Sequence, residues 1–374
     1  MTSKEKSALQ KEIVDSLDTK PHGRLILAPR IGKTKLIIDI IKRDKIESIL
    51  WVTPSAKLAD EDIPQEFETW KAKKYLKNLT TSTWMSLHKV FGSFDMIVLD
   101  EEQFATEHNL QSFFDGSIQC NHIVSMTGTQ TKHEDKQDLY KRLDLEILYE
   151  LSINNAVDIG LLSNYKLNVL EVELGTEKNV LAGSKEKPFM TTEQSQYTYL
   201  DKSMKQALFQ KRKDAQFKVL ARRRFIANAN SKFEAVKYLL NSLEGRKLIF
   251  CGGIKQAEAL SEHTYHSKTD NISLKNFQNG EIDELAMVNT GGTGYTYKAI
   301  DHLFVIQCDS DKNGLTSQKI CRTLLQQKDY LATIWLVVLK NTQDEVWVAS
   351  TLENFDQSKV ECVNFKSYIK NEKI

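Results

Sequence analysis

Short runs of consecutive apolar residues alternate with amphipathic stretches along the first 130 residues of the chain. The strands that this pattern predicts there span residues 24–28, 48–53, 95–100 and 122–126, with a helix at 34–42. The second half repeats the pattern, with predicted strands at 166–173, 247–251, 284–288, 302–307 and 333–339 and helices at 257–263 and 318–327. Continuously apolar strands that alternate with helices are typical of parallel sheets covered on both faces. The chain is therefore predicted to be an α/β protein with two sheets in tandem.

A boundary between two domains is expected between residues 150 and 163, after the last motif of the first half. We place it so that the first domain spans 1–155 and the second spans 156–374. The length of 374 residues agrees with this division, because a single hydrophobic core seldom grows that large.

One segment of the second half, residues 191–230, is long, polar and prone to form helices. Between Asp201 and Arg224 it holds nine basic and two acidic residues, whereas the whole chain has a net charge of only +1. Such a patch can bind phosphates electrostatically, and we assign this role to Arg222, Arg223 and Arg224. A solvated helix face without a partner is the alternative. We expect a basic helical insertion in the second domain at about 191–230.

The cysteines and the apolar runs bear on the cellular setting. The five cysteines contain no C-x-x-C pair, and the amino-terminal sequence is polar. The most apolar run, residues 334–339, is far too short to cross a bilayer. These features favour a reducing, cytoplasmic setting and no contact with membranes.

Residues 28–34, Ala-Pro-Arg-Ile-Gly-Lys-Thr, follow a predicted strand and open a predicted helix, which is the context of a phosphate-binding loop. Backbone N–H groups around Gly32 would surround the β-phosphate of a nucleotide, and Lys33 would reach the β- and γ-phosphates. The Thr34 hydroxyl would bind Mg²⁺. The first glycine of the usual pattern is absent, because its position holds Leu27. An ordinary strand-to-helix turn is the alternative interpretation.

Residues 100–103, Asp-Glu-Glu-Gln, close the apolar run of another predicted strand. A carboxylate at a strand end, here Asp100, can hold Mg²⁺ through water, and Glu101 beside it can polarise an attacking water. An acidic, solvated turn is the alternative interpretation. The position of this tetrapeptide after the phosphate loop favours the hydrolysis of ATP with Mg²⁺ at Thr34 and Asp100.

These motifs resemble those of superfamily 2 helicases and translocases, and the resemblance covers nearly the whole chain. Gln10 resembles the glutamine that reads adenine in that family. Segments 52–55, 81–87 and 126–130 resemble motifs that contact nucleic acid or couple it to the ATP state. Trp84 fits either the core or a stacking platform. The residues that these segments imply as nucleic-acid contacts are Thr53, Pro54, Thr83, Thr127 and Thr129.

The second half continues in the order of the family's motifs. The glycine loop 289–294 resembles one that lies between nucleic acid and nucleotide, which implies Thr290 as a nucleic-acid contact and Gly294 as an ATP contact. Gln318 and Arg322 resemble the helix that faces the triphosphate, with Arg322 as an arginine finger.

Two positions of the second half depart from the family pattern. Thr296 replaces a frequent aspartate, and Leu325 stands where a second arginine is usual. The first departure puts one contact to the nucleotide in doubt, and the second leaves Arg322 as the matched arginine.

The resemblance implies two tandem RecA-like domains that bind ATP and Mg²⁺ and move along nucleic acid. The catalytic residues that it implies are Asp100, Glu101, Gln103, Gln318 and Arg322. The ATP-binding residues that it implies are Gln10, Pro29, Arg30, Ile31, Gly32, Lys33, Thr34, Lys35 and Gly294.

The compact length resembles that of phage-type recombination and replication helicases. DNA is favoured over RNA because the Thr-Gly-Thr segment, the Asp-Glu-Glu-Gln tetrapeptide and residues 160–163 look more like those enzymes than like RNA-remodelling DEAD-box enzymes. We also expect a monomeric protein and, for a viral chain, the host cytoplasm. Two alternatives stay open. A packaging-type ATPase would share the phosphate loop and the Asp-Glu pair, and a degenerate nucleic-acid-binding module would bind without turnover.

Overall fold

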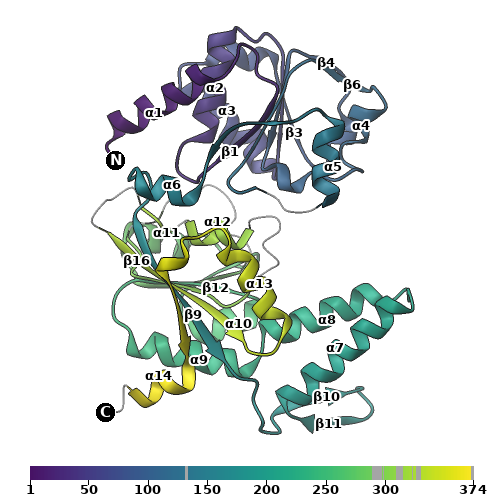
Figure 1. The fold of residues 1–374 in the computed structure, drawn as a ribbon, viewed down its shortest axis with the longest axis vertical. Helices are drawn as coiled ribbons and strands as arrows, with labels where there is room; N and C mark the ends of the chain where they lie inside the picture. The colour runs from purple at the N-terminus through teal and green to yellow at the C-terminus, as the bar shows by residue number, and fades with distance from the viewer. Residues whose placement is uncertain are drawn as a thin grey trace. The chain divides into compact units, whose positions relative to one another are not determined.

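The computed structural model describes residues 1–130, 134–288, 297, 299–308, 315–321, 323–325 and 330–371. These residues form two compact units. The first unit contains residues 1–162 together with residues 315–318, and the second contains the other described residues from 163 onward. Figure 1 shows the sheet of each unit with helices beside it.

The first unit is built on a six-stranded sheet in the order β3-β2-β5-β7-β1-β8, in which every pairing is parallel. Its strands are β1 (Gly23–Leu27), β2 (Ile49–Thr53), β3 (Leu79–Thr83), β5 (Met96–Asp100), β7 (Ile123–Thr127) and β8 (Ile147–Leu151). Its main helices are α1 (Ser3–Ser16), α2 (Lys33–Asp44), α3 (Ile63–Thr69), α4 (Gln111–Phe114), α5 (Glu134–Arg142) and α6 (Ile153–Asp158). Strands β4 (Gly92–Phe94) and β6 (Ile118–Cys120) form a separate pair. Every residue of β1, β2, β5 and β7 is buried, so the centre of the sheet is covered on both faces.

The second unit holds a seven-stranded parallel sheet in the order β13-β14-β12-β15-β16-β9-β17. Its strands are β9 (Asn164–Val172), β12 (Lys247–Cys251), β13 (Thr264–Tyr265), β14 (Glu284–Val288), β15 (His302–Val305), β16 (Leu331–Leu339) and β17 (Val360–Asn364). Helices of this half are α9 (Asn230–Ser242), α10 (Ile254–Leu260), α11 (Ile272–Asn279), α12 (Leu315–Cys321), α13 (Gln343–Leu352) and α14 (Phe365–Asn371).

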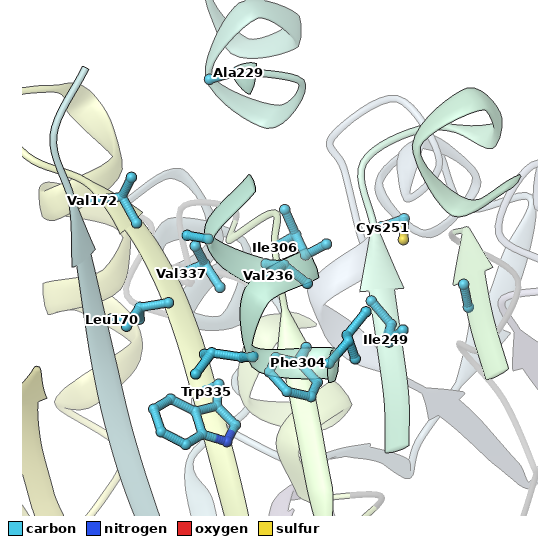
Figure 2. Close-up of a cluster of buried hydrophobic side chains, with 14 of the residues drawn as sticks. Leu170, Val172, Ala229, Val236, Ile249, Cys251, Phe304, Ile306, Trp335 and Val337 are labelled. Atoms are coloured by element: carbon cyan, nitrogen blue, oxygen red, sulfur yellow. The ribbon is translucent and has the colours of Figure 1, made fainter. Parts of the chain in front are cut away.

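The core of the second unit contains side chains from its sheet and from α9, as Figure 2 shows. Phe304 of β15 stacks on Trp335 of β16, with ring centroids 6.3 Å apart and planes 9° from parallel. Val236 of α9 belongs to the same buried cluster. Burial of these large apolar groups holds the helix against the sheet.

Two hairpins are inserted between β9 and α9. Strands β10 (Val180–Gly183) and β11 (Pro188–Thr191) pair antiparallel, and helices α7 (Glu193–Phe209) and α8 (Ala215–Ala227) pack against each other. Figure 1 shows the α7–α8 pair projecting from the sheet of its unit. The structure thus contains the predicted basic helical insertion.

The predicted α/β class with two parallel sheets is confirmed, but several bounds differ. The helix predicted at 318–327 is α12, which begins at Leu315 and ends at Cys321, and the Thr323 N–H then donates to the Ile320 carbonyl in a tight turn. The helix predicted at 257–263 is α10, which begins earlier. Strands β3, β8 and β17 were not predicted, because their residues are only partly buried and form no continuous apolar run. None of the helices in the described ranges has the length and apolar character to span a bilayer.

A buried ion pair ties α9 to the start of α13 in the second unit. Lys232 Nζ lies 2.5 Å from Asp344 Oδ2 and donates to the Ile306 carbonyl at 2.8 Å. Both side chains are almost fully buried, and Asp344 also accepts from the Leu339 N–H. Burial raises the pKa of Asp344 despite the opposing charge of Lys232.

We expect Lys232→Met to lower the free energy of unfolding by about 3–5 kcal/mol, because it leaves the buried Asp344 carboxylate without its partner. Urea unfolding of this variant checks the value. Lys237→Met, on the exposed side of α9, is the matched control and should change stability by less than about 0.5 kcal/mol. Equal stability of the two variants would contradict the assignment.

Candidate functional site

The predicted phosphate-binding loop between β1 and α2 contains two residues with positive φ. Gly32, the residue before α2, has φ +88° and ψ +57°, and Arg30 has φ +69°. Glycine suits this left-handed conformation, and a Cβ on Gly32 would come within 2.7 Å of Gln10 Nε2, so the Gln10 side chain would have to shift. The loop leads into the amino terminus of α2, where backbone N–H groups and the helix dipole favour anions.

The side chain of Gln10 in α1 contacts this loop. Its Nε2 donates to the Ile31 carbonyl at 2.6 Å, and its side chain is buried. The contact puts Gln10 beside the phosphate loop, as its predicted role requires, although its amide nitrogen bonds to the protein itself.

Three basic side chains, Lys6, Arg30 and Lys35, lie near one another at the loop. Burial lowers the pKa of Lys6, one helical turn before Gln10, and the charges of Arg30 and Lys35 lower it further. Lys35, predicted to bind ATP, forms an ion pair with Asp39 of the same helix at 2.5 Å. Lys6 was missed from the sequence, where nothing distinguishes it from other lysines of a polar helix. The cations provide a positive potential that suits a polyphosphate.

Asp100 and Glu101 stand at the end of β5, and Glu101 faces the phosphate loop. Lys33 Nζ lies 2.6 Å from Glu101 Oε1. Burial would raise the pKa of Glu101, but Lys33 and the hydrogen bonds to the carboxylate hold the pKa below its usual value. Burial would likewise lower the pKa of Lys33, yet the charges of Glu101 and Asp100 raise it. Both groups are therefore charged at neutral pH.

Asp100 differs from its neighbour. Burial raises the pKa of Asp100 to about 7, although the charge of Lys33 opposes that change. A buried carboxylate with so little compensation fits a site for a further cation. Mg²⁺ is usually held by one or two protein oxygens plus substrate phosphates, and the Asp100 carboxylate and the Thr34 hydroxyl are donors of that kind.

A hydrogen-bonded chain continues from Glu101 into the end of β7. Gln103 Nε2 donates to Glu101 Oε2 at 2.8 Å, and Thr127 Oγ1 donates to Gln103 Oε1 at 2.9 Å. The Thr129 N–H points back to Thr127 Oγ1 at 3.4 Å. The predicted catalytic tetrapeptide and the Thr-Gly-Thr segment are thus joined in one network.

Glu102 takes no part in that chain and instead anchors the turn. Arg24 of β1 donates to its carboxylate from Nη2 at 2.5 Å and from Nε at 3.0 Å, and the Ser125 hydroxyl donates to it as well. The Arg24 guanidinium also lies 3.9 Å from the centroid of the Tyr140 ring. Glu101 is held at φ +54°, a region that non-glycine residues seldom adopt, directly before this anchor. Glu102 therefore stabilises the turn that directs the Glu101 side chain toward Lys33.

We expect Glu102→Gln to lower the free energy of unfolding by about 3–5 kcal/mol, because Arg24 would keep a buried charge without its counter-ion. The control is Glu107→Gln, whose partner Arg142 lies on the surface at 2.8 Å, and its cost should stay below about 1 kcal/mol. Thermal unfolding of both variants measures these two losses of stability. A Glu102→Gln protein as stable as the control would show that the pair does not anchor the turn.

The first-unit residues predicted to contact nucleic acid lie in two environments. Pro54 and Thr83 are half-buried, whereas the side chains of Thr53, Thr127 and Thr129 are buried. Thr127 faces Gln103 rather than solvent, so its hydroxyl serves the network here. Trp84 is buried and donates from Nε1 to the Asp100 carbonyl at 3.0 Å, so it belongs to the core and is not a stacking platform.

Of the residues predicted from the second half, Gln318 is described. It is grouped with the first unit, and its Nε2 donates to Glu101 Oε2 at 2.9 Å. Thr290, Gly294 and Arg322 lie outside the described residues. Their assignments stay predictions from the sequence.

The three arginines of the basic segment are not equivalent. Arg222 is buried and its Nη1 lies 2.5 Å from Asp201 Oδ1, so it joins α8 to α7. The prediction that Arg222 presents its charge to phosphate is therefore corrected, because helical spacing turns it toward the partner helix. Arg223 is half-buried and Arg224 is exposed.

No protein-family model and no curated protein matches the sequence. Solved structures do match. S. cerevisiae Dbp5 bound to RNA and ADP BeF3 has a TM-score of 0.55 and 12% identity over 97% of this chain and 91% of its own. A variant of Dbp5 with the same ligands gives 0.55 and 12% over 98% and 92%. The Pyrococcus furiosus Hef helicase domain gives 0.48 and 12% over 93% and 97%.

These likenesses define the class of fold. Like the two Dbp5 structures, the chain has two tandem RecA-like domains, each built on a parallel sheet with helices beside it.

Proposed function

We propose that the protein is an ATP-dependent helicase or translocase of superfamily 2 that acts on nucleic acid. The observation that carries the proposal is the contact of Lys33 with Glu101, which brings the phosphate loop and the strand-end carboxylates into one site. Fold alone does not specify function, so the argument rests on this site.

Each residue of the site has a proposed part in ATP hydrolysis. The loop at Gly32 and the Lys33 amine bind the phosphates, and Glu101 accepts a proton from the attacking water. Mg²⁺ at Thr34 and Asp100 would neutralise charge on the phosphates. Bound phosphate competes with Glu101 for Lys33, and release of Glu101 frees it to act as a base.

The Gln103–Thr127 bond supports coupling between hydrolysis and nucleic acid. A change at Glu101 alters its bond with Gln103, and Gln103 passes the change to the Thr-Gly-Thr segment. Two domains that close on ATP and open after hydrolysis would then move one strand, with Arg322 as arginine finger and Pro54, Thr83 and Thr290 as contacts.

Steady-state ATP hydrolysis with single-stranded DNA, duplex DNA, forked DNA and RNA tests the proposal. We expect stimulation by nucleic acid, and we favour DNA from the sequence motifs, although the Dbp5 structures contain RNA. A monomeric, cytoplasmic protein remains part of the proposal. Absence of hydrolysis with every nucleic acid would favour a binding module without turnover.

Arg223 and Arg224 supply a separate prediction about phosphate contacts. If both bind phosphates, the Arg223→Ala/Arg224→Ala variant should reduce the slope of log K against log salt by about 1.4 on single strands. Arg142→Ala, an exposed arginine of the first unit, is the control and should leave the slope unchanged. Titrations by fluorescence anisotropy at several salt concentrations measure the slopes. An unchanged slope in the double variant would assign this run to a solvated face.

A further inference from the structure

A cavity of about 690 Å³ lies at the base of α7 in the second unit. Its wall includes Tyr197, Lys202 and Lys205 of α7, and Lys340 just after β16. The cavity therefore stands at the carboxyl end of a strand in a parallel sheet, the edge at which such sheets bind ligands. Its volume falls within the range of small-molecule sites.

The net charge of this cavity is positive once its ion pairs are counted as neutral. Asp201, one of its two acidic residues, is neutralised by Lys205 at 2.7 Å and by Arg222 at 2.5 Å. The other, Glu173, forms an ion pair with Lys366. Lys340 pairs with Glu171 at 2.8 Å. Lys202 is exposed and forms no ion pair within the described part of the chain. A ligand with phosphate groups suits this balance.

The outer face of α7 shares Lys202 with the wall of the cavity. Met204 and Ala207 are buried. Tyr199, Lys202 and Phe209 follow one another at intervals of three and seven residues, which places them on the opposite face of the helix. Tyr199 is 62% exposed and Phe209 is 90% exposed. Two aromatic rings thus stand about 15 Å apart along the helix with a lysine between them.

We propose that the outer face of α7 and the cavity at its base form an accessory site for single-stranded nucleic acid. Tyr199 and Phe209 stack on bases, and Lys202 contacts phosphates at the cavity. Exposed aromatic rings interleaved with cations are how proteins hold single strands without reading sequence. The proposal rests on the proposed function, since it assigns a strand-holding surface to a nucleic-acid translocase.

Binding to bases is separable from binding to backbone. The test uses the full chain without nucleotide and measures anisotropy of labelled oligothymidine and oligouridine, and of an abasic deoxyribose-phosphate strand of equal length. Tyr199→Ala/Phe209→Ala should weaken binding to at least one of the two base-containing strands by about tenfold or more and leave binding to the abasic strand unchanged. Lys202→Ala should weaken binding to all strands and reduce the salt slope by about 0.7.

Phe217→Ala is the matched control. Phe217 is 72% exposed on the same hairpin, but its position on α8, two residues after the buried Ala215, turns it away from α7. Arg224 follows Phe217 by seven residues and lies on the same face of α8. Its long charged side chain can still reach phosphates from that face, whereas a phenylalanine ring stacks only on a base that it touches. We therefore expect Phe217→Ala to bind every strand as the unaltered protein does.

Three results would overturn the proposal. The first is normal binding of every strand by the Tyr199→Ala/Phe209→Ala variant. The second is a loss of affinity by that variant that is as large on the abasic strand as on the base-containing strands. The third is a loss of affinity in Phe217→Ala as large as that in the double variant. Normal nucleic-acid binding by the double variant would favour an acidic protein as the partner of this face. Failure of the proposed function is a different result, because it appears as ATP hydrolysis that no nucleic acid stimulates in the unaltered protein.

Discussion

The Glu101→Gln variant should bind ATP normally and hydrolyse it about 10²–10⁴ times more slowly than the unaltered protein. Glutamine keeps the shape of the side chain and can still accept a hydrogen bond from Lys33, but it cannot take a proton from water. The reason lies in the electrostatics of the site, since Lys33 and Gln103 keep the Glu101 carboxylate charged at neutral pH.

The measurement combines steady-state hydrolysis with binding of a fluorescent ATP analogue. Glu102→Gln is the internal comparison, because it removes the neighbouring carboxylate by the same substitution. We expect Glu102→Gln to lose more stability than Glu101→Gln, because the Arg24–Glu102 pair is almost fully buried whereas the Lys33 and Glu101 side chains are each 19% exposed. A Glu101→Gln protein with normal kcat would show that the strand-end carboxylate is not the base.

Lys33→Ala should reduce kcat/KM for ATP by at least about 10²–10³ and also weaken nucleotide binding. The Lys33 amine stands at the start of α2, where it can place a full charge on the β- and γ-phosphates. Its removal also leaves the buried Glu101 carboxylate without its ion-pair partner. Binding and turnover should therefore fall together, unlike in Glu101→Gln.

Lys42→Ala is the control for this substitution. Lys42 lies on the same helix, with its side chain 40% exposed and its Nζ 3.8 Å from Asp39. It should hydrolyse ATP at the normal rate. Near-normal ATP affinity in Lys33→Ala would remove the phosphate-binding role of the loop.

The sequence was sufficient to predict the fold class and to locate the two ends of the hydrogen-bonded network that joins Lys33 to Thr127. Strands β1, β5 and β7 are uninterrupted apolar runs, so their carboxyl ends could be located, and Lys33, Glu101 and Thr127 stand at or just beyond them. The contact between Lys33 and Glu101 follows from parallel strands that share one edge.

The Arg24–Glu102 ion pair was not predicted, although the sequence contained one indication of it. Arg24 is a charged residue inside a predicted buried strand, and such a residue needs a partner. Its partner could not be found from the sequence, because Glu102 lies 78 positions away on another strand end. The same limit applies to Arg222, whose direction depends on how α8 packs against α7.

The most direct test of the account asks whether hydrolysis drives movement along nucleic acid. Streptavidin bound at either end of a biotinylated strand, DNA or RNA, is offered to the protein with ATP, and its displacement is timed. We predict that the unaltered protein displaces streptavidin from one end with ATP, and that it fails with a non-hydrolysable analogue. Glu101→Gln should fail with ATP. Rapid nucleic-acid-stimulated hydrolysis without displacement from either end of any strand would contradict the account.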